Sequence, residues 1–187
     1  DGGTANGGVD TITETIAITV NAVNDAPVRT AGTVSALTVN EDAAITSLGL
    51  SGVTYGPGGG ADEASQALTY MVTDVPAASL GNITLADGTT VVSASTTYTL
   101  AQIQGMKFVP AANANGSGSF SYSVTDNGGT ANGGVNTITE TIAIVVNAVN
   151  AAPVSTAGTV SALTVNEDAA LTSLVLSVVS YGLGGGA

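Results

Sequence analysis

The sequence predicts an all-β protein made of tandem antiparallel β-sandwich units. Three observations support this prediction. The composition is rich in Thr, Val, Ala, Ser, Gly and Asn, a mixture that suits strands joined by tight turns. Apolar residues alternate with polar ones along several short stretches, as expected of strands with one buried face. A long segment also recurs almost unchanged with a period of 126 residues.

The repeat sets the expected organisation of the chain. Residues 2–61 recur at 128–187, and only nine of the sixty aligned positions differ. We therefore expect one complete unit over residues 26–151. Residues 1–25 would be the C-terminal part of a preceding unit, and residues 152–187 the N-terminal part of a following unit. Such copying typically adds length or avidity rather than catalytic chemistry.

Within the complete unit, seven to nine short strands are expected. They are 36–40, 44–53, 67–73, 82–85, 89–93, 96–100, 106–109, 119–125 and 138–146. Turn-forming residues separate them at 56–60, 86–88 and 127–129. One helical turn is expected at 101–104. Glu140 interrupts the apolar row of the last strand, which predicts a strand end or a bulge there.

Charge and composition argue against several classes of function. The net charge is -12, and Arg29 and Lys107 are the only basic residues, which argues against nucleic acid and anionic membranes. Without His there is no common activator for a Ser or Thr nucleophile, and 4% aromatic residues are few for a glycan-cleaving cleft. No apolar run is long enough to span a membrane. We expect a protein that is not an enzyme, with Lys107 on the outward face of a strand.

Five motifs follow one another along the unit. They are VNDAPV at 23–28, LTVNED at 37–42, LTYMVT at 68–73, FVPAANANG at 108–116 and FSYSVTD at 120–126. In this order they resemble the bacterial cadherin-like repeats of giant type I-secreted surface adhesins. The resemblance implies an immunoglobulin-like (Ig-like) or cadherin-like sandwich and an extracellular or cell-surface location. The chain departs from the pattern by extra glycines at 56–60 and 128–134, and by Ala114 at a usually aromatic position.

The resemblance also implies where a metal would bind. In a cadherin-like sandwich, the loops after the second strand and before the last strand lie beside the incoming linker. Such a junction gathers oxygen ligands, of which Ca²⁺ takes six to eight. The candidate Ca²⁺ ligands are Asn24, Asp25, Asp62, Glu63 and Asp126 at the first junction. At the opposite end they are Glu41 and Asp42, together with linker residues Asn147 and Asn150; Glu167 and Asp168 are the copies in the next unit.

An alternative interpretation of these acidic residues stays open. Asp and Asn also favour turns for backbone reasons alone, so the candidates could be solvated turn residues. Ala151 stands where the first linker has Asp25. This substitution predicts that any Ca²⁺ binds more tightly at the first junction than at the second. The glycine runs allow two interpretations as well, flexible loops or close backbone approach between units.

Three functions are compatible with these observations. The first is an extender repeat of a large bacterial adhesin that mediates cell adhesion or biofilm-type attachment. The second is a subunit of a self-assembling extracellular filament or surface layer, because few charges guard the edge strands. The third is a non-catalytic module of a secreted polysaccharide-active enzyme. Expected partners are neighbouring repeats of the same chain, and further copies of the chain if fibres form.

Overall fold

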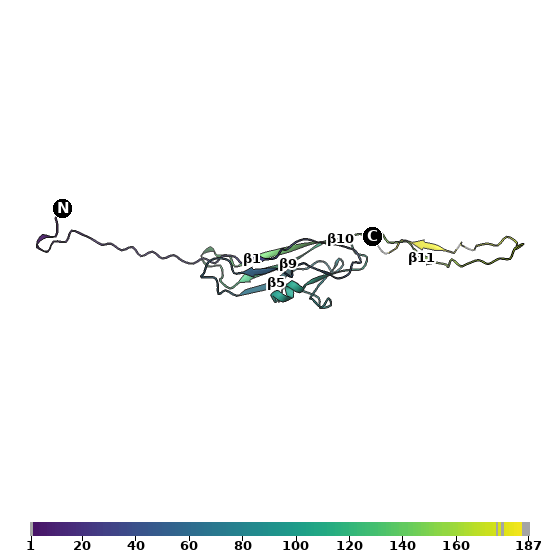
Figure 1. Ribbon diagram of the computed structural model, residues 1–187, viewed down its shortest axis with the longest axis horizontal. Coiled ribbons are helices and arrows are strands. Elements are labelled where there is room, and N and C mark those ends of the chain that lie inside the picture. The colour runs from purple at the N-terminus through teal and green to yellow at the C-terminus, as the bar shows by residue number, and fades with distance from the viewer. Residues whose placement is uncertain (1, 175, 177, 185–187) are drawn as a thin grey trace.

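A computed structural model describes residues 2–174, 176 and 178–184. The middle of the chain forms a β-sandwich, and extended segments leave it at opposite ends (Figure 1). In chain order the elements are η1 (Ala5–Gly7), β1 (Val28–Ala31), β2 (Leu37–Asn40), β3 (Thr46–Ser47), β4 (Thr54–Gly56), β5 (Leu68–Asp74), β6 (Gly81–Thr84), β7 (Thr96–Tyr98), α1 (Leu100–Gly105), β8 (Lys107–Pro110), β9 (Gly116–Asp126), η2 (Ala131–Gly133), β10 (Thr137–Asn147), β11 (Val154–Ala157) and β12 (Ser180–Gly182).

Two sheets form the sandwich. One has five strands in the order β2-β10-β9-β5-β7, and the other has three in the order β3-β8-β6. Strands β1 and β4 form a separate antiparallel pair. Strand β10 pairs with β9 in antiparallel fashion, but it pairs in parallel with β2. This arrangement confirms the predicted all-β sandwich.

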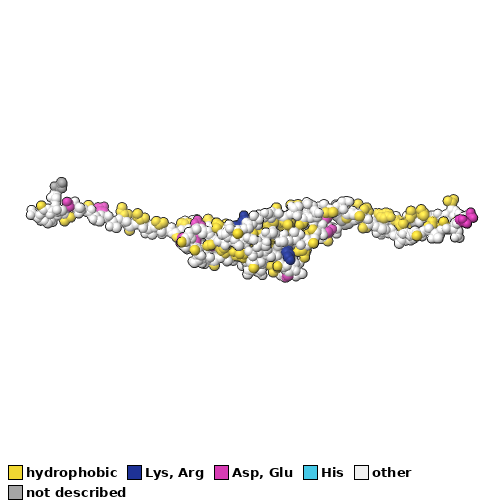
Figure 2. Space-filling view, viewed as in Figure 1, with side chains coloured by type: hydrophobic (Ala, Val, Ile, Leu, Met, Phe, Trp, Pro, Cys, Tyr) yellow, Lys and Arg dark blue, Asp and Glu magenta, His cyan; other side chains and the backbone are white. Residues whose placement is uncertain are grey.

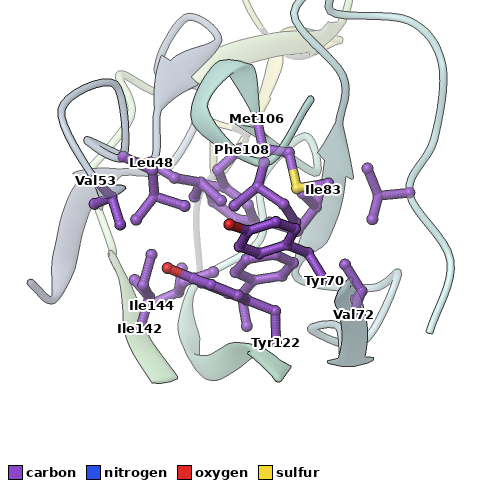
Figure 3. Packing of buried hydrophobic residues seen from close by; sticks show 14 of the residues in the cluster. Leu48, Val53, Tyr70, Val72, Ile83, Met106, Phe108, Tyr122, Ile142 and Ile144 are labelled. Atoms are coloured by element: carbon purple, nitrogen blue, oxygen red, sulfur yellow. The ribbon is translucent and has the colours of Figure 1, made fainter. Parts of the chain in front are cut away.

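The alternating residues of the two sheets meet in one core (Figure 3). Strand β9 contributes Phe120 and Tyr122, and β8 contributes Phe108; all three side chains are fully buried. The short helix α1 adds Ile103 to the same cluster. Its first turn is fixed by a capping box between Thr99 and Gln102, which satisfies backbone donors that a helix start leaves free.

Two predicted strands are wrong in part. The stretch 44–53 contains only the short strand β3, and β4 begins after it at Thr54. Positive-φ Gly49 and a turn from Leu50 to Val53 end the strand early. The stretch 89–93 makes only a single bridge, at Val91. There the Asp87 carboxyl accepts hydrogen bonds from the backbone of Thr89 and Thr90, which favours a turn over a ladder.

Glu140 also differs from its prediction. It lies in the middle of β10, opposite Tyr122, and the register is regular on both sides of it. A charged residue is tolerated on the inner face of β10 because the Tyr55 hydroxyl donates a hydrogen bond to the Glu140 carboxyl group. In addition, Arg29 Nη1 lies 3.6 Å from Glu140 Oε1. Lys107 lies on β8 as expected, and its ammonium donates to the carbonyl of Ala86.

The flanking segments repeat sequence of the sandwich, but their described residues do not fold into a second sandwich with a buried core. Residues 11–21 correspond to β10, yet they run extended, and Ile16 is 84% exposed where Ile142 is fully buried. On the other side β11 pairs with β12 in the register of β1 with β4. Val154 opposes Gly182 as Val28 opposes Gly56.

Candidate functional site

The incoming linker is held by an asparagine that contacts three residues of the sandwich. The side-chain amide of Asn24 donates to Asp126 Oδ1 at 3.0 Å and to the carbonyl of Val135 at 2.7 Å. Its amide oxygen accepts from Gln66 Nε2 at 2.7 Å, and its carbonyl accepts from the Val135 N–H at 2.9 Å. One linker residue therefore joins segments that precede β5 and that connect β9 with β10.

A buried glutamate holds the next linker residue. Glu63 is 3% exposed, and its Oε1 accepts a hydrogen bond of 2.6 Å from the backbone N–H of Asp25. The residue Asp25 itself is exposed to solvent. The contact therefore depends on the backbone of residue 25 rather than on its side chain.

Glycines let the loops approach the linker closely. A Cβ atom at Gly58 would overlap the carbonyl of Ala26, and one at Gly59 would overlap the carboxyl group of Glu63. A Cβ at Gly128 would overlap the side chain of Asn24. Gly58 and Gly59 also have positive φ values of 89° and 49°. These glycines allow close approach within the unit and to its linker, while close approach between units stays a prediction.

A small polar cavity lies at the incoming linker, beside Asn24 and Glu63. It measures about 180 Å³, and its lining includes Asn24, Asp62, Glu63 and Gln66. Three buried side-chain oxygens at this end have no hydrogen-bond partner in the described structure, namely Glu63 Oε2, Gln66 Oε1 and Asp126 Oδ2. Burying such atoms unpaired is costly, so the cavity favours a polar occupant.

These oxygens fit a Ca²⁺ ion only in part. The three free oxygens are fewer than the six to eight ligands that Ca²⁺ takes. Over the described range, no group of three or more Asp, Glu, His or Cys side chains is placed to hold a metal ion. The structure brings Asn24, Asp62, Glu63 and Asp126 to one end of the sandwich, with only the backbone of Asp25 in contact. Calcium binding stays a prediction.

The outgoing linker is held in a similar way at the opposite end. Glu41 is 4% exposed, and its Oε1 accepts a hydrogen bond of 2.6 Å from the N–H of Val149. Its own N–H donates to the carbonyl of Asn147 at 2.8 Å. Asp42 instead accepts from the N–H of Asn113, away from the linker. Its copy Asp168 has the same positive φ, 59° against 57°.

Sequence reasoning missed several of the partners at these ends. Val135 and Val149 contribute backbone groups, which every residue type carries, so no sequence signal marks them. Gln66 donates to Asn24 through its side chain. A sequence signal could have indicated Gln66: it directly precedes the predicted strand 67–73 and follows Asp62 and Glu63 within four positions.

A second polar cluster, away from the linkers, joins the β1–β4 pair to the five-stranded sheet. The hydroxyl groups of Tyr55 and Tyr122 lie 2.7 Å apart, and Tyr55 donates to Glu140 Oε1 at 3.3 Å. Burial raises the pKa of Tyr122 to about 12. Burial and the hydrogen bond to Tyr122 raise the pKa of Tyr55 as well. Both phenols are neutral at ordinary pH and serve as a buried contact between β4 and β9.

A sandwich of this topology, with a linker anchored at each end, defines an Ig-like structural module. Residues 24–139 match the model of a family described as Bacterial Ig domain, and the chain belongs to that family. Bacterial Ig-like domains are commonly found in surface or extracellular proteins and are generally non-catalytic. Neither a curated protein nor a solved structure gives a significant match. No helix in the described part of the chain has the length and apolar character to cross a membrane.

Proposed function

We propose that the chain is an extender segment of a large extracellular bacterial adhesin or surface protein, which mediates cell adhesion or biofilm-type attachment. The observation that supports this proposal most directly is the position of the two linkers. They leave the sandwich at opposite ends, and a buried glutamate contacts each of them (Figure 1). Each added copy would therefore lengthen the protein instead of folding back on its neighbour.

Two further observations agree with an extender role. The family is that of bacterial Ig-like modules, which are surface-exposed structural units. The sequence repeats with only nine differences in sixty positions, so successive units present the same ends to one another. Nearly identical ends let any number of units join by similar junctions.

Arrays with increasing numbers of the 126-residue repeat test the proposal. Negative-stain electron microscopy should show thin rods whose contour length rises linearly with copy number, because each junction extends the chain. Deleting repeats from the parent protein should lower attachment of cells while leaving export unchanged. Arrays that collapse into compact particles of irregular shape would contradict the extender role.

One observation favours the alternative of a self-assembling filament. The outward face of the five-stranded sheet is lined mainly by hydroxyl and apolar side chains, with Asp74 at the end of β5 as a charged residue on this face. The other charged residues of these strands, Asp126 and Glu140, lie on the inner face. Hydroxyl groups pair across strands on the outward face, as between Ser121 and Thr141 and between Thr125 and Thr137. Ordered fibres in micrographs of the purified chain would favour this alternative.

The Ca²⁺ prediction is tested separately. Isothermal titration calorimetry on arrays of two repeats should show tighter Ca²⁺ binding at a junction with Asp25 than at one with Ala151. The reason is that the substitution removes a carboxyl group from the linker. Equal affinity for both junctions, or no heat of binding at either, would contradict the prediction.

A further inference from the structure

We propose that Glu63 and Glu41 are backbone latches that order the inter-repeat linkers without a metal ion. Glu63 with the N–H of Asp25 forms what we call the entry latch, and Glu41 with the N–H of Val149 forms the exit latch. The inference rests on the proposed extender function, because it explains how successive units keep a fixed orientation.

The geometry of the two latches is the same. Each glutamate is at least nine-tenths buried, at 3% and 4% exposure, and each accepts one linker N–H at 2.6 Å. Both distances fall slightly below the usual range for N–H···O bonds, in the direction expected of a bond to a carboxyl group. In both cases the donor belongs to the linker and the acceptor to a loop of the sandwich.

Each latch is supported by a second contact that fixes the linker next to it. At the entry, the side chain and the carbonyl of Asn24 are bonded to Asp126 and Val135. At the exit, the N–H of Glu41 donates to the carbonyl of Asn147, which continues the parallel ladder of β2 with β10. In each case the linker is therefore held at two positions, the latch residue and a residue just before it.

In an array whose next unit repeats Glu63, both latches would act on one linker. Val149 corresponds to Val23 and Ala151 to Asp25, because the repeat is 126 residues long. The exit latch of one unit and the entry latch of the next thus hold residues two positions apart. In an extended chain this separation is about 7 Å, which leaves little backbone between the two anchors to act as a hinge.

The latch also explains a substitution that a metal site does not. The second linker has Ala151 in place of Asp25, so a carboxyl group is lost from the junction. The entry latch uses only the backbone N–H at this position, and alanine supplies that donor equally well. A junction built on backbone donors therefore tolerates the change.

Amide hydrogen exchange of the full chain in EDTA tests the proposal directly. The amides of Asp25 and Val149 should be protected without metal, because exchange requires the latch to open. Glu63→Ala should accelerate exchange of the Asp25 amide by about tenfold or more and leave Val149 unchanged. Glu41→Ala should have the opposite pattern. In each variant the unaffected latch reports that the sandwich is still folded.

Three control variants separate a latch from a metal ligand. Glu63→Gln keeps an acceptor oxygen but removes the charge, so protection of the Asp25 amide should be largely retained. Asp25→Ala should leave protection unchanged. Asp62→Ala changes an exposed carboxyl in the same cavity lining and should also have no effect. A metal site predicts instead that all three variants weaken Ca²⁺ binding, because each removes a carboxylate charge from the site.

Two outcomes would overturn the proposal. One is an Asp25 amide that exchanges freely in EDTA and becomes protected only when Ca²⁺ is added. The other is a Glu63→Ala variant with unchanged exchange at Asp25. Either result would leave the extender function standing if arrays still lengthen linearly in micrographs, so the two proposals fail separately.

Discussion

The hydroxyl pair of Tyr55 and Tyr122 shows how single residues set the response of the sandwich to pH. Tyr122 is fully buried, and burial raises its pKa to about 12 from an ordinary 10.0. Burial is the main cause that raises the pKa of Tyr55 too. Folding therefore favours the neutral phenols, because a buried phenolate would lose its hydration.

This pair predicts a loss of stability in alkaline solution. A raised pKa means that the contribution is fully present below pH 10, the unfolded value, and is lost as the pH rises toward the folded values. The contribution of this pair to the free energy of unfolding should be constant below pH 10, and urea denaturation should show a fall in stability between about pH 10 and 12. Tyr122→Phe should lower it by about 1 kcal/mol at neutral pH and weaken the alkaline fall. An unchanged alkaline slope in this variant would contradict the assignment.

Elements with strong alternation were predictable from the sequence, and elements fixed by distant partners were not. Strands β5, β9 and β10 were predicted to within a few residues, because each puts apolar residues on one face of a sheet. Strand β1 was not predicted, since its exposed residues carry no alternation and depend on pairing with β4. The linker anchors are harder still, because backbone donors such as the N–H of Val149 leave no trace in the sequence.

The two copies of the last strand give a matched test at the scale of elements. Ile142 in β10 is fully buried, while Ile16, in the same local sequence, is 84% exposed. Ile142→Ala should lower the free energy of unfolding by about 2–5 kcal/mol, because it leaves a cavity in the core. Ile16→Ala should change it by less than about 0.5 kcal/mol. Equal effects of the two substitutions in urea denaturation would show that residues 11–21 pack into a core as well.

Charge is unevenly distributed over the whole molecule. The net charge is -12, and the space-filling view shows acidic side chains near the ends of the sandwich and on the flanking segments (Figure 2). One cross-strand row on the outward face of the five-stranded sheet consists of Thr97, Met71, Ser123 and Thr139. Like-charged copies repel each other, so an uncharged face is where two such rods would approach at least electrostatic cost.

This distribution predicts how a charge would alter lateral association between copies. Thr139→Lys places an ammonium group in the middle of the uncharged face, where its burial between two copies would be costly. It should lower the extent of association measured by sedimentation velocity at high protein concentration. Asn82→Lys adds the same charge at an exposed position of β6, in the three-stranded sheet, and should leave lateral association unchanged or raise it by reducing the net charge. If both lysine variants associate like the parent chain, contacts between copies do not form through the five-stranded sheet, and the extender role is favoured over the filament.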